Sequence, residues 1–172
     1  PTDWIVGLSP TANLTIGPGK IVSQADPVGA EMKGPDTSGA LRLTSGATAT
    51  RFGDVHSWIR VYRTREDGGT YGVARNYVKG AEALATGETG FLFTPPDGGS
   101  RVNAGLLVIE GATGTVSIVD AAGAPLSAPF AFRWPAGSHL QASTIFSAFG
   151  IPPAPSARIV YTVTKGRVVP FG

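Results

Sequence analysis

The two histidines, His56 and His139, are the side chains of this 172-residue chain best suited to acid–base or metal chemistry. They lie in different halves of the sequence, so one chain does not supply a multi-histidine metal site. Asp54 and His56 alternate onto one face of an expected strand, whereas Ser57 points to the other face. This alternation argues against a local Ser-His-Asp catalytic triad. A triad of this kind would need a serine from a distant part of the chain. We therefore predict no catalytic residues, no metal and no cofactor, and hence no enzyme.

Carboxylates in turns are the second candidate for chemistry. Glu66, Asp67 and Asp97 lie in glycine-rich loops, and Asp120 lies at an expected hairpin. Calcium takes roughly six to eight oxygen ligands, and no segment has the alternating Asp/Asn spacing that supplies them locally. We interpret these carboxylates as solvated turn residues.

One expected strand carries a row of side chains that favours binding. His56, Trp58, Arg60 and Tyr62 alternate onto one face of it. Aromatic rings with hydrogen-bond donors stack on sugars, and Trp, Tyr and Arg dominate the energetics of protein interfaces. The alternative is that this face packs beneath residues 69–77 or against the second half of the chain, with the stem of Arg60 covering apolar surface. These four residues are our candidates for contact with a ligand or partner.

The amino-acid composition indicates which kinds of secondary structure must position these residues. Charged residues make up 15% of the chain, below the roughly 25% usual in soluble domains, and 24 Gly and 14 Pro predict short strands joined by tight turns. The absence of cysteine excludes disulfides and thiolate metal sites. A formal net charge of +2 argues against nucleic acid as a partner. No apolar run reaches the roughly 18–20 residues of a membrane-spanning helix, so we expect no membrane span.

Period-2 alternation predicts the strands. Residues 101–109 are apolar on both faces, which is typical of a central strand. Residues 115–119 and 158–164 alternate as half-buried strands. Turns that contain Gly separate the strands, at 17–19, 67–69, 97–99 and 122–123. Helical signals are brief and occur only at 26–34 and 143–150, where Ser143 or Thr144 is the expected N-cap and Gly150 the stop.

The end of the chain repeats its beginning. Residues 12–45 can be laid over residues 130–165, with strands, turns and a short helical turn in the same order. We therefore predict two related units, at 1–82 and 83–172. The second copy has strands before its matching segment, and the first has almost none. Either the first unit lacks its leading strands and leaves a sheet edge or groove open to another chain, or the two halves complete each other as a single closed sandwich, or the sequence was cut at that point.

The order of these motifs resembles that of a large group of tandem β-domains in secreted and cell-surface bacterial proteins, most of them uncharacterised. The resemblance covers about residues 12–172 and rests on turn and strand patterns at 38–43, 58–63, 69–72, 83–88, 101–105, 119–123 and 135–137. It implies an extracellular or cell-surface location, and it brings no functional residues with it. The fold that we predict is all-β, with two related jelly-roll-like or immunoglobulin-like antiparallel β-sandwich units, of which the first is complete or lacks its opening strands.

The function that these observations favour is that of a non-enzymatic structural module, which self-assembles in a bacterial surface appendage or filament. Its partners would be copies of itself, as a homo-oligomer or polymer paired through open sheet edges. The alternative is a carbohydrate-binding or adhesive module that uses the Trp58 face, with a glycan as partner. Because the chain opens at Pro1, we expect it to be a mature, processed or excised piece of a longer protein.

Overall fold

The computed structural model describes residues 20, 23, 58–64, 66–76, 78–97 and 101–172. They fall into two compact units, one holding 84–172 and the other holding the described residues between 58 and 83. Nearly all regular structure in both units is antiparallel β-strand, so the all-β prediction is confirmed. The assignment of two repeats to 1–82 and 83–172 stays a prediction.

The smaller unit is a β-hairpin followed by a helical turn. Strand β1 (Trp58–Thr64) pairs antiparallel with β2 (Thr70–Asn76) over seven residue pairs. In the connecting turn the Gly69 N–H donates to Asp67 Oδ1 at 2.9 Å, and Gly68 has φ +79, which confirms the turn predicted at 67–69. The 3-10 helix η3 (Gly80–Glu82) follows, and its Glu82 carboxylate accepts the Lys79 N–H at 3.1 Å.

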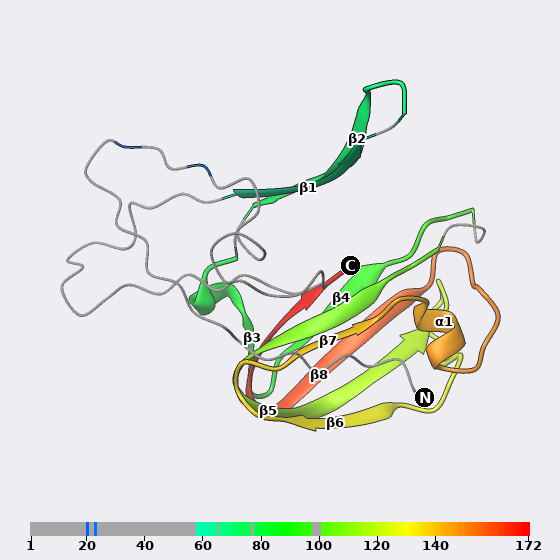
Figure 1. Cartoon of the computed structure of the whole chain (residues 1–172). Helices are drawn as coiled ribbons and strands as arrows, with labels where there is room; N and C mark the ends of the chain where they lie inside the picture. Colours follow the sequence, from blue (N-terminus) through cyan, green and yellow to red (C-terminus); the bar gives the residue numbers. More distant parts are fainter. Residues whose placement is uncertain (1–19, 21–22, 24–57, 65, 77, 98–100) are drawn as a thin grey trace. The chain divides into compact units, whose positions relative to one another are not determined.

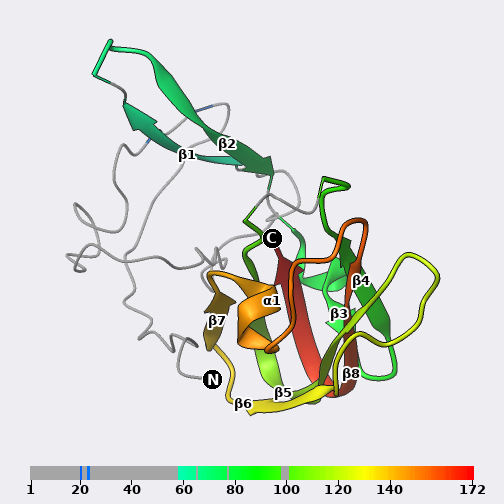
Figure 2. The ribbon, with the colours of Figure 1, turned by 90° about the vertical axis from the view of Figure 1, so that its right-hand side faces the viewer.

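The larger unit is one six-stranded antiparallel sheet. Its strands are β3 (Leu84–Ala85), β4 (Thr89–Phe93), β5 (Ala104–Val119), β6 (Phe130–Trp134), β7 (His139–Ala142) and β8 (Arg158–Phe171). The two long strands β5 and β8 pair at the centre, as Figures 1 and 2 show. Strands β3 and β4 follow one another along the outer side of β8, and β6 and β7 do the same along β5.

The regular pairing of the sheet is interrupted midway along the two long strands, and the flanking strands break at the same level. The β5–β8 register shifts between Val108 and Gly114, and Gly166, with φ +80, lies against the backbone of Gly111 in that region. On one side β3 and β4 are separated by residues 86–88, and on the other β6 and β7 are separated by residues 135–138. Extra residues in a ladder bend strands and increase their twist, so both long strands change direction here.

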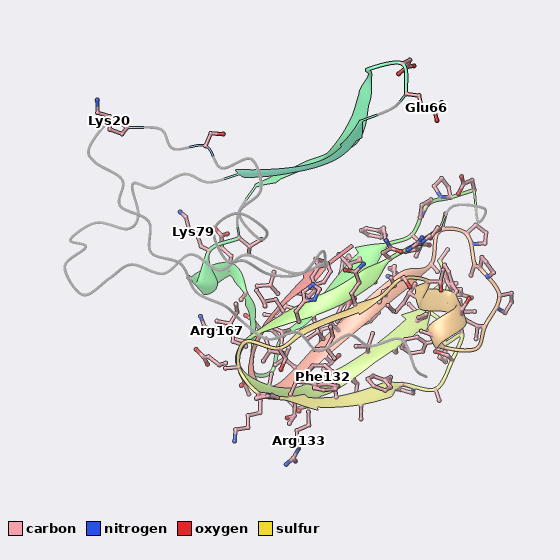
Figure 3. All side chains as sticks on the ribbon, viewed as in Figure 1. Lys20, Glu66, Lys79, Phe132, Arg133 and Arg167 are labelled. Atoms are coloured by element: carbon pink, nitrogen blue, oxygen red, sulfur yellow. The ribbon has the colours of Figure 1, made fainter. Side chains whose placement is uncertain are left out.

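A single apolar cluster lies on one side of these bent strands. It takes the side chains on the inner face of β5 and β8 on both sides of the interruption, including Leu106, Ile118, Ile159 and Val168, each at most 1% exposed. The inward positions predicted in 115–119 and 158–164 are confirmed, since Val116, Ile118, Ile159, Tyr161 and Val163 are all buried. On β6 the neighbours Phe132 and Arg133 lie on opposite sides of the sheet, the first buried and the second exposed (Figure 3).

Helix α1 (Ile145–Ala148) adds Ile145 and Phe146 to the same cluster. It begins after Thr144 and ends before Gly150, which has φ +67, as the sequence predicted. Within the described residues, no helix is long and apolar enough to cross a bilayer.

Tyr161 places a phenol hydroxyl inside this apolar cluster, and the energetic cost of burying that hydroxyl can be measured. Its side chain is 1% exposed, its hydroxyl has no hydrogen-bond partner among the described residues, and burial raises the pKa of the phenol. An unpaired buried hydroxyl costs about 1–3 kcal/mol. We therefore expect Tyr161→Phe to leave the free energy of unfolding in urea unchanged or to raise it by about 1 kcal/mol. A loss above 1 kcal/mol would show that the hydroxyl is hydrogen bonded.

Candidate functional site

The structure places three of the four predicted contact residues on one strand. Trp58, Arg60 and Tyr62 occupy alternate positions of β1. Their partners in the register are small or polar residues of β2, namely Asn76, Ala74 and Gly72. His56, like Asp54 and Ser57, lies outside the described residues, so the predicted row of four stays a prediction at that end.

The edge of the larger sheet presents a second candidate, which starts from the backbone of β4. The Thr94 N–H donates to the Ala157 carbonyl at 2.9 Å, and the Val163 N–H donates to the Glu88 carbonyl at 3.0 Å. In an antiparallel pair the residues that exchange such bonds recur every second position. The bonds of β4 to β8 therefore fall on the even-numbered residues of β4.

The backbone N–H and C=O groups of the odd-numbered residues of β4 point away from β8, in the plane of the sheet. Gly90 and Leu92 pair with Tyr161 and Ile159, in step with the bonds at either end of the strand. The N–H and C=O groups of Thr89, Phe91 and Phe93 consequently point to the outer edge of the sheet. No other strand of the described residues pairs with β4 there.

The same strand exposes the largest apolar side chains of the unit. Phe91 is 53% exposed and Phe93 is 71% exposed, and among the described residues only Val78 is a comparably exposed large hydrophobic residue. The two rings pack edge to face, with centroids 5.2 Å apart and planes at 81°. Edge-to-face packing is a preferred arrangement of aromatic pairs, so contact between the two rings stabilises both in their exposed positions.

The sequence of β4 contains none of the usual devices that protect a sheet edge. Natural edges carry lysine, proline or bulges that discourage pairing with another chain, whereas Thr89–Phe93 reads TGFLF. Such devices occur only at its ends. The Glu88 carboxylate accepts the Ala85 N–H at 2.7 Å in the break that precedes the strand, and Pro95 and Pro96 follow it. Within the described part of the chain, the unpaired edge of β4 therefore spans the five residues Thr89–Phe93.

Threonines occupy part of the outer face of the sheet, the face opposite the buried cluster. The Thr89 and Thr162 hydroxyls lie 3.2 Å apart, and the Thr113 and Thr164 hydroxyls lie 2.9 Å apart. These threonines satisfy one another across neighbouring strands. Among the described residues of this unit, only Phe91 and Phe93 are large apolar side chains that are mostly exposed, and the neighbouring Val160 is partly buried.

His139 is the one histidine in the described residues, and its surroundings are apolar. It is 8% exposed on β7, and its ring stacks on that of Phe171, with centroids 5.0 Å apart and planes at 9°. The Phe171 ring lies over Gly105, where any Cβ would collide with it. Burial lowers the pKa of His139. In the described structure, the imidazole therefore takes part in packing with Phe171.

The enclosure of His139 predicts how stability depends on pH. The unfolded chain binds the proton with the ordinary pKa of 6.5, and the folded protein binds it with a lower pKa. The stability from this site is therefore fully present above about pH 6.5 and is lost as the pH falls toward the lowered value. We expect the thermal midpoint to fall between pH 7.5 and 5, and His139→Gln to reduce that fall. An equal fall in both proteins would contradict this assignment.

No group of three His, Asp or Glu side chains in the described part of the chain is placed to hold a metal ion. Of the carboxylates considered above, Asp67 and Asp120 accept backbone N–H bonds within their own turns, from Gly69 at 2.9 Å and from Ala124 at 2.8 Å. These bonds agree with the interpretation as turn residues. The absence of metal, cofactor and catalysis stays a prediction.

Comparison of the chain with protein-family models, with curated proteins and with solved structures finds no match. The site therefore has to be interpreted from its own chemistry. Sequence reasoning missed Phe91 and Phe93 as exposed residues. The signal available was their spacing of two in a short strand bounded by Gly87 and Pro95, but all of Phe91–Phe93 is apolar, and that pattern does not say which face is covered.

Proposed function

We propose that the protein is a non-enzymatic structural module that self-associates in an extracellular or cell-surface bacterial assembly, such as a surface appendage or filament. The observation that carries this proposal is the open β4 edge, which has outward backbone groups and two exposed phenylalanines but no charge or proline. Edges of this kind bind another strand by extending the sheet. The sequence left an open edge in the first unit as one alternative, and the edge on which the proposal rests lies in residues 84–172.

The architecture that we propose for this module is a pair of related jelly-roll-like or immunoglobulin-like sandwiches. Its support is the single buried cluster, which takes side chains from β5 and β8 on both sides of the interruption. A bent sheet that covers its own inner face is one way to build a sandwich core. The duplication of residues 12–45 in 130–165 and the resemblance to tandem β-domains support the second unit and the surface location.

Self-association is tested with the intact chain. Sedimentation velocity and light scattering from micromolar to millimolar protein are expected to show an average mass that rises with concentration, and electron micrographs of the native material should show oligomers or filaments. A chain that remains strictly monomeric over this range would contradict the proposal.

The alternative function, carbohydrate binding or adhesion, depends on the hairpin. The placement of Trp58 and Tyr62 at alternate positions of β1, opposite Asn76 and Gly72, is what favours it. Glycan-array binding that is abolished by Trp58→Ala and retained by Phe91→Lys would make this the better account.

A further inference from the structure

We propose that β4 pairs with β4 of a second copy of this chain, antiparallel and about a two-fold axis at Phe91. This inference rests on the proposed function and names the surface and the register that it uses. It follows from which backbone groups of the strand are free.

The register of the proposed pair is set by the residues whose backbone N–H and C=O groups point away from β8. With Phe91 opposite its own copy, Thr89 lies opposite Phe93 of the second copy, and Phe93 lies opposite its Thr89. All three are residues whose N–H and C=O groups point away from β8. Every outward group of the strand then has a partner across the axis. A register displaced by one residue would instead oppose groups already bonded to β8.

The side chains agree with this register. The side chains of Thr89, Phe91 and Phe93 lie on one face of the sheet, the face opposite the buried cluster, because they alternate with those of Gly90 and Leu92. Directly opposed aromatic residues stabilise an antiparallel pair, and like charges destabilise it. The pairing would place the two Phe91 rings together with Phe93 diagonal to them. Because the strand has no charged residue, self-pairing brings no like charges together within it.

The exposed area indicates how strong the contact is. With about 200 Å² for a whole phenylalanine side chain, exposures of 53% and 71% correspond to about 250 Å² per copy, or about 500 Å² for two. Specific stable interfaces bury roughly 1,000 Å² or more. Even with the backbone added, the pair is of the weak class, so we expect a dissociation constant in the high micromolar to millimolar range.

The symmetry limits what this edge can build. A two-fold contact uses the same patch on both copies and closes on itself, so it gives dimers and not chains. The turn at Thr86–Glu88 and the prolines after Thr94 prevent the paired segment from growing longer. A filament of this protein would therefore need a second surface in addition to β4.

A charge exchange tests the register. In the proposed pairing, Thr89→Lys combined with Phe93→Glu places each lysine opposite a glutamate of the other copy. Thr89→Lys combined with Phe93→Lys places lysine opposite lysine and removes the same two native side chains. We expect the Lys/Glu protein to dimerise at least tenfold more tightly than the Lys/Lys protein in low salt, and the difference to shrink in 1 M NaCl. Equal dissociation constants in low salt would overturn the register.

Single cysteines locate the contact independently, since the natural chain has none. With a short bismaleimide, Phe91→Cys is expected to give a covalent dimer, and Ala131→Cys, on the exposed part of β6, is expected to stay monomeric. Far-ultraviolet circular dichroism checks that both variants keep the sheet. Oligomers that form equally well in Phe91→Lys would overturn the β4 pairing but leave self-association intact. A wild-type chain that never associates would overturn both proposals.

Discussion

Gly166→Ala is expected to destabilise the sheet by about 3 kcal/mol or more. Gly166 has φ +80 at the point where β8 bends, and the Cβ of an alanine would collide with the carbonyl of Gly111 and the Cα of Ala112 on β5. Left-handed backbone costs roughly 1–2 kcal/mol for a residue with a Cβ, and forced overpacking costs about 1–3 kcal/mol more. Equilibrium unfolding in urea measures the loss.

Gly87→Ala is the matched control for this substitution. Gly87 has φ +87 in the break between β3 and β4, but a Cβ there would meet no atom within 4 Å. Only the backbone strain applies, so we expect a loss of about 1 kcal/mol. If both variants lose the same stability, the close approach of β8 to β5 at the bend is wrong.

Ile159→Ala is expected to cost about 3 kcal/mol, because Ile159 is 0% exposed and joins the buried cluster between its strand partners Leu92 and Ile118. Large-to-small substitutions of buried isoleucine cost about 2–5 kcal/mol. In a chain of this size the thermal midpoint should fall by roughly 6–12 °C. Differential scanning calorimetry of the intact chain provides the measurement.

The neighbouring Val160 provides the comparison on the opposite face of β8. It is only partly buried and pairs with the exposed Phe91. Val160→Ala is expected to cost less than about 1 kcal/mol, as surface substitutions do. A larger loss at Val160 than at Ile159 would mean that the two faces of β8 have been assigned the wrong way round.

The strands could be predicted where one face alternates cleanly with the other. Ser117 separates Val116 from Ile118, and Thr162 separates Tyr161 from Val163, and burial of one face follows from that alternation. Only Val160, between Ile159 and Tyr161, interrupts the pattern in 158–164. The length of the strands could not be predicted. Gly111 and Gly114 suggest a break, yet β5 runs through them from Ala104 to Val119. Glycine here allows bulges and close strand packing, and sequence alone does not separate that role from a turn.

The site that the sequence predicted and the site that the structure suggests lie on different strands, β1 and β4. Low charge and an open edge favoured association, but the alternating row at Trp58, Arg60 and Tyr62 drew the prediction to the hairpin. Phe91 and Phe93 look like core residues, because phenylalanine in an apolar strand is usually buried. Among the described strands, β4 pairs only with β8, and this place in the sheet order is a property that no local sequence pattern contains.

The central claim is that the outer edge of β4 is open in the isolated chain and closed by a second copy. Amide hydrogen exchange measured by NMR at two protein concentrations tests it residue by residue. In dilute protein the amides of Thr89, Phe91 and Phe93 should exchange fast while those of Gly90 and Leu92 are protected, and concentrated protein should slow the three fast amides. Odd-numbered amides that are already protected when dilute, or that exchange at the same rate at both concentrations, would contradict the claim.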